Sequence, residues 1–228
     1  MLVNLPFLLF ALLLLWFPRQ WMRLGVSIMR RRTKSPSEIR RAEEPWNQRE
    51  RGDPRVDFRR EFGKVRNHVD WLRAGAGSLA VMGGLGIEPC LTLAENAGPL
   101  VGRELFVVKL GILLVGLLIQ TVRYEKSRFL FFAPIFFLCG VSVGLCGAKG
   151  ALFAFAMVWA LNPMLGSPQG FLAVYAMLML GFGLLFLGIK NKLPIVALVY
   201  CLLPVLLSLL AQRPLVLFSK RGSRAHGT

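Results

Sequence analysis

The sequence predicts an all-α, polytopic integral membrane protein with six to seven transmembrane helices and a basic cytoplasmic helical segment between the first and the second. Seven apolar runs with almost no charge support this fold class, because about 20 helical residues cross a hydrocarbon layer. The apolar share of 55% is also above the roughly 45–50% of soluble domains. The runs lie near residues 2–17, 74–93, 104–122, 129–147, 150–166, 170–189 and 194–211.

One strongly basic stretch, from Arg19 to Arg73, separates the first run from the others and holds 16 Lys/Arg against 8 Asp/Glu. It is too short and too charged to bury a core of its own. The first run lacks the basic start and the small-residue cleavage site of a signal peptide. As a helix it is about 24 Å long, so it either spans the membrane or only enters it. We therefore expect an N-terminal membrane anchor helix (1–18), a basic cytoplasmic segment with amphipathic helices (19–73), a six-helix transmembrane bundle (74–211) and a basic cytoplasmic tail (212–228).

The distribution of charge predicts the orientation. The chain has a net charge of +16, and Lys and Arg are enriched on the cytoplasmic side of membrane proteins. If all seven runs cross and the N-terminus lies outside, 23 of the 28 basic residues fall inside. If residues 150–166 do not cross, the tail moves outside and the bias weakens. We expect the cytoplasmic membrane of a bacterium, with a cytoplasmic C-terminus. No zinc-finger or RNA-binding pattern accompanies the charge, so nucleic acid is not an expected partner.

A periodic apolar pattern lies at the end of the basic segment. Its spacings of three and four residues place it on one helical face, and we expect one helix that continues into the run from residue 74. Three interpretations remain open for this helix: it packs on the cytoplasmic end of the bundle, lies on a lipid surface, or binds a protein partner. The pattern consists of Phe58, Phe62, Val65, Val69, Leu72 and Ala76.

Basic residues of this segment are candidates for contact with anionic lipid. A basic residue near the headgroups contributes about 1 kcal/mol to membrane attraction. The expected partners are therefore the lipid bilayer, with anionic lipid at the cytoplasmic face, and alternatively a membrane protein. The candidate residues are Arg30, Arg31, Arg32, Arg59, Arg60, Lys64, Arg66 and Arg73.

Two charges, Glu88 and Lys109, fall inside apolar runs that a short outer loop connects. Each lies about 7–8 Å from the outer end of its run at 1.5 Å per residue. An unpaired charge costs about 2.5–3.5 kcal/mol at the centre of a membrane helix, so we predict that the two form an intramembrane ion pair. The alternatives are that Lys109 extends outward and Glu88 faces water, or that the two serve a proton or ion site.

The sequence lacks the residue patterns of several chemistries. The two histidines, His68 and His226, lie in polar segments, and there is no HExxH, nucleophile elbow or P-loop. We therefore expect no metal, no cofactor and no catalytic residues. The four cysteines lie in apolar runs, where free cysteine packs as a small hydrophobe. Gly140 and Gly144 form a G-x-x-x-G pattern that favours close helix packing, in the bundle or in a dimer.

Three functions remain open. The first is a non-catalytic assembly, scaffold or accessory membrane protein, favoured by the missing catalytic motifs. The second is a small-solute or lipid permease or flippase, favoured by the polar residues within the apolar runs. The third is a membrane enzyme that acts on lipid-linked substrates. A polar chamber at mid-depth would favour transport, an Arg- and Glu-lined cytoplasmic groove an enzyme, and a dry interior the first function.

Overall fold

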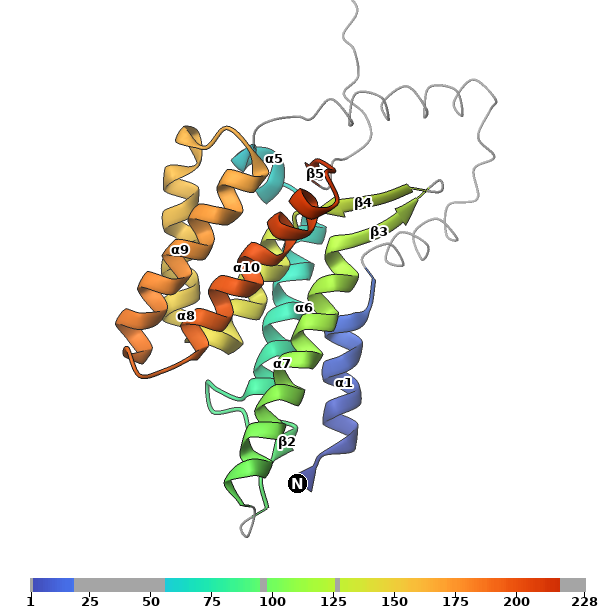
Figure 1. The fold of residues 1–228 in the computed structure, drawn as a ribbon, viewed down its shortest axis with the longest axis vertical. Coiled ribbons are helices and arrows are strands. Elements are labelled where there is room, and N and C mark those ends of the chain that lie inside the picture. Colours follow the sequence, from blue (N-terminus) through green and yellow to red (C-terminus); the bar gives the residue numbers. More distant parts are fainter. Residues whose placement is uncertain (1, 19–55, 95–97, 126–127, 218–228) are drawn as a thin grey trace, which may run out of the picture.

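The computed structural model describes residues 2–18, 56–94, 98–125 and 128–217. This part of the chain is a helical bundle with two small β-sheets (Figure 1). Four of its helices are long and apolar enough to cross a membrane, which confirms the prediction of a multi-pass integral membrane protein in contact with lipid. They are α7 (Pro99–Thr121), α8 (Ile135–Leu161) with the adjoining 3-10 turn η1 (Asn162–Met164), α9 (Pro168–Leu187) and α10 (Leu193–Leu210). The shorter helices are α1 (Leu5–Trp16), α5 (Phe58–Phe62) and α6 (Val65–Met82).

Helix α8 is a helical hairpin. Gly147 interrupts it with φ 74° and ψ 160°, a conformation that is essentially restricted to glycine. The ring of Phe136, near the start of α8, lies 6.2 Å from that of Trp159, near its end. In a continuous helix these residues would be about 35 Å apart. The first arm (135–146) and the second arm (148–161) therefore run in opposite directions, with the tight turn that the adjacent apolar runs require. The stretch that is long enough for one membrane crossing is thus divided into two shorter arms.

The first arm of α8 is the centre of the bundle. All of its residues are buried except Gly144, which is half-buried. Helix α6 packs directly against it, because a methyl group at Gly140 would lie 2.6 Å from the backbone nitrogen of Gly75. Ser78 Oγ donates a hydrogen bond of 3.0 Å to the Gly140 carbonyl across this contact. The G-x-x-x-G pattern thus serves packing within the bundle.

Helix α1 lies between α6 and α7. Leu15 is fully buried and occupies the space left by two glycines, since a methyl group at Gly77 would lie 2.7 Å from the Leu15 side chain and one at Gly116 3.3 Å from it. Trp16 Nε1 donates a hydrogen bond of 3.0 Å to the carbonyl of Ile112 on α7. The N-terminal end is held by β1 (Leu2–Val3), which pairs antiparallel with β2 (Leu91–Thr92).

A second sheet lies at the opposite end of the bundle from β1 and β2 (Figure 1). Strand β3 (Val122–Glu125) pairs antiparallel with β4 (Arg128–Phe132), and β5 (Leu215–Val216) pairs parallel with β4. The prediction of a helix over 129–147 is therefore wrong at its start. Pro134 occupies the N-cap position of α8, so helix begins only after the strand.

The helix predicted through the series from Phe58 to Ala76 is divided in two. Helix α5 ends at Phe62 and α6 begins at Val65, with an elbow at Gly63 and Lys64. Helix α6 also stops at Met82, before the predicted end of its apolar run. Gly83 adopts φ 85° there, and a tight turn follows it. The chain then passes between the two ends of the bundle seven times in the described residues, as α1, α6, α7, the two arms of α8, α9 and α10 (Figure 1).

Candidate functional site

The charged side chains buried in the described part of the chain all lie on α5 and the first half of α6, together with the buried Asn67. Asn67, Asp70 and Arg73 lie on the inward face of α6 and are 1%, 2% and 8% exposed. Val65 and Leu72 of the apolar series face outward and are 75% and 61% exposed. Helix α6 therefore places its polar face in the bundle and its apolar face outside, which is favourable for a helix in lipid because the surrounding solvent is apolar.

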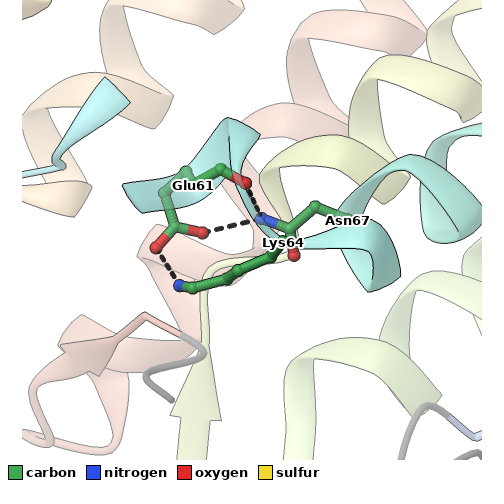
Figure 2. Close-up of polar contacts among 3 residues, drawn as sticks. All are labelled: Glu61, Lys64 and Asn67. Carbon is green, nitrogen blue, oxygen red and sulfur yellow. Dashed lines mark hydrogen bonds and ion pairs between the residues drawn. The ribbon is translucent and has the colours of Figure 1, made fainter. Parts of the chain in front are cut away.

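The elbow is closed by hydrogen bonds between residues six apart (Figure 2). Asn67 Nδ2 donates to the backbone carbonyl and to the carboxylate of Glu61, each at 2.8 Å. The same carboxylate forms an ion pair with Lys64 Nζ. A nitrogen of the His68 ring, Nε2, lies 2.8 Å from the Phe62 carbonyl, which can only accept. The last carbonyls of α5 are thus capped by side chains of α6, and the angle between the two helices is fixed.

An aromatic cluster holds α5 on the open end of the α8 hairpin. Phe62 contacts Phe136 of the first arm and Trp159 of the second, with ring centroids 5.2 and 5.1 Å apart. Phe58 also lies edge-on to Trp159, at 5.3 Å. The preceding chain is held in place as well, since Asn162 Nδ2 donates a hydrogen bond of 2.6 Å to the Val56 carbonyl. The segment from Val56 to the elbow is therefore a fixed part of the bundle.

A second polar group joins three helices below the elbow. Arg73 Nε and Asp70 Oδ1 form a buried ion pair at 2.9 Å. Arg73 also donates to the backbone carbonyl of Phe17 at the end of α1, which accepts a further hydrogen bond of 3.1 Å from Gln120 Nε2 on α7. The guanidinium lies 5.5 Å from the ring centroid of Phe137, a cation–π distance. These groups hold the end of α1 between α6 and α7.

The centre of the bundle is largely apolar. Tyr175 and Ser142 are its main polar side chains: Tyr175 Oη lies 3.4 Å from Ser142 Oγ, which donates a hydrogen bond of 2.8 Å to the Leu138 carbonyl. All four cysteines are buried and free. Among the described residues, no group of three or more His, Cys, Asp or Glu side chains could hold a metal ion. The arrangement supports packing.

The basic residues that were predicted to contact anionic lipid differ in their exposure and in their partners. Arg59 is exposed and Arg66 is half-buried, whereas Lys64 and Arg73 form internal ion pairs. Arg60 lies in α5, and its side chain is outside the described part, as are Arg30, Arg31 and Arg32.

Glu88 and Lys109 lie near the end of the bundle that carries β1 and β2. Glu88 is exposed in the loop after α6, and Lys109 is half-buried on α7. In the described part of the chain, Glu88 and Lys109 do not form an ion pair with each other. The energetic coupling between them stays a prediction.

Sequence reasoning did not identify Asn67 and Glu61 as a linked pair. The signal that could have found it is the run of polar residues three apart through Glu61, Lys64, Asn67, Asp70 and Arg73.

No protein-family model, curated protein or solved structure matches the chain.

Proposed function

We propose that this protein is a non-catalytic accessory or scaffold protein of the membrane, with all seven helical passes crossing the bilayer and the elbow end in the cytoplasm. The contacts of its buried charged side chains support this function. Glu61, Asp70 and Arg73 are the charged side chains buried in the described residues, and each is bonded to another part of the same chain. These contacts hold helices together.

The position of the connections supports seven crossings. The turns after α6 and between α9 and α10 lie at the end with β1 and β2, and the elbow and β3–β5 lie at the other (Figure 1). The turn at Gly147 lies at the first end too, because the open end of the α8 hairpin packs on α5. The exposed Lys149, Lys190 and Lys192 are at the first end. The second end adjoins the basic segment that precedes residue 56, so the positive-inside rule assigns it to the cytoplasm.

Thiol accessibility tests the absence of a water-filled path. Cys139 and Cys201 lie in the bundle centre and are 0% and 1% exposed. In membranes, a charged methanethiosulfonate reagent should leave both unmodified until the protein is denatured. Met164→Cys, at an 83% exposed position, is the positive control in a chain with Cys90 and Cys146 replaced by serine. Modification of Cys139 or Cys201 in the folded protein would instead favour a permease.

A further inference from the structure

The elbow carries a surplus of positive charge in its sequence. Residues 56–73 include five basic and three acidic side chains, a net charge of +2 before His68 is counted. Glu61 and Asp70 are buried in pairs with Lys64 and Arg73. The acids that could compensate the remaining arginines are therefore largely engaged. Among the described residues, neither Arg59 nor Arg66 belongs to an ion pair.

An exposed apolar strip on α6 begins directly after the elbow. Val65, Val69 and Leu72 are 75%, 41% and 61% exposed, and Ala76 continues the strip along α6. Arg66 follows the first of these residues, and Arg59 lies four residues before the elbow. Such a helix is complementary to an anionic phospholipid. Its basic start matches the charged headgroup, and its apolar outward face matches the acyl chains.

We propose that the elbow and the outward face of α6 bind an anionic phospholipid of the cytoplasmic leaflet, with its headgroup at Arg59 and Arg66 and an acyl chain along Val69, Leu72 and Ala76. This inference rests on the proposed orientation and extends the proposed function, because it names the lipid that the elbow contacts. Charge complementarity favours a lipid over a protein partner. Arg59 and Arg66 lie at the start of the strip, and Asp70, the acidic residue next to Val69, is buried in its pair with Arg73.

Local fluorescence quenching tests the site. Val69→Cys is labelled with bimane in a chain whose four native cysteines are replaced by serine. The protein is reconstituted in phosphatidylcholine that contains brominated phosphatidylglycerol or brominated phosphatidylcholine, and the ratio of quenching gives the local lipid preference. We expect phosphatidylglycerol to be preferred at this position. Each arginine should contribute about fivefold, the factor equivalent to about 1 kcal/mol.

Two comparisons localise the effect. Arg59→Gln with Arg66→Gln should abolish the preference at position 69, whereas Lys190→Gln with Lys192→Gln, an equal loss of charge at the other end, should retain it. Bimane at Leu185, which is 71% exposed on α9, should show no preference. Equal quenching by the two lipids at position 69, an unchanged preference in the arginine variant, or an equal preference at position 185 would overturn the proposal. Thiol accessibility is a separate readout, so modification of Cys139 or Cys201 would refute the proposed function while leaving this site in place.

Discussion

Phe136 and Trp159 are 23 positions apart in the sequence, and their ring centroids are 6.2 Å apart. Both rings also contact Phe62 of α5. This relationship requires α8 to reverse its direction, and the reversal occurs at Gly147. It also explains how two adjacent apolar runs can be two passes with scarcely any loop between them.

The reversal predicts that Gly147→Ala destabilises the protein. Gly147 has φ 74° and ψ 160°, and a side chain there costs about 1–3 kcal/mol of backbone strain, although no atom would obstruct the new methyl group. Gly150→Ala is the matched control, because its methyl group would make only ordinary contacts, the nearest at 3.6 Å. A thermal scan of the protein in mild detergent should show a lower melting temperature for Gly147→Ala only. Equal stability of the two variants would contradict the hairpin.

Much of the fold could be predicted from the sequence because lipid imposes a simple rule on helix length and polarity. The apolar runs gave α7, α9 and α10, and the adjacent runs on either side of Gly147 required a tight turn. The β3–β4 hairpin could not be predicted in this way, since Phe129 to Phe132 is as apolar as a membrane helix. Its strand state depends on pairing with β3 and with β5, which lies some 85 residues further on.

The contact between α6 and α8 predicts a strong effect of Gly140→Ala. The new methyl group would lie 2.6 Å from the Gly75 nitrogen and 2.7 Å from Ala74 Cβ, so the two helices must separate. Overpacking of this kind costs about 1–3 kcal/mol or more. Gly181→Ala on α9 has no atom within 4 Å of the new methyl group and should leave the melting temperature nearly unchanged. A destabilisation by Gly181→Ala as large as that by Gly140→Ala would show that the loss does not come from the close contact between α6 and α8.

The candidate site was less predictable than the fold. Apolar periodicity identified the face from Phe58 to Ala76, but it could not show that Gly63 divides this face. Phe58 and Phe62 then pack on α8 and Val65 faces outward. The inward polar face of α6 depends on partners far along the chain, Phe17 and Gln120, which a local pattern does not contain.

The pair of Asp70 and Arg73 predicts non-additive mutational effects. Arg73→Met leaves the buried Asp70 carboxylate without its cation and removes a donor from the Phe17 carbonyl, which should cost about 3–5 kcal/mol. The double variant Asp70→Asn with Arg73→Met removes the stranded charge and should recover part of this loss. A double-mutant cycle on the free energy of unfolding in detergent is the measurement. A double variant as unstable as the sum of the two single variants would mean that the pair is not coupled.

The final prediction concerns orientation, on which the lipid site also depends. The two ends of the bundle carry exposed turns that can be labelled one at a time, because the four native cysteines are buried. Lys190→Cys lies between α9 and α10, and Arg213→Cys follows α10 at the other end, so one helix separates the two positions. In intact cells a membrane-impermeant maleimide should label position 190 and spare position 213. In inverted membrane vesicles the result should reverse, because the positive-inside rule places the more basic end in the cytoplasm. Labelling of both positions from the same side would show that α10 does not cross the membrane, and the opposite pattern would invert the orientation and move the elbow to the outer leaflet.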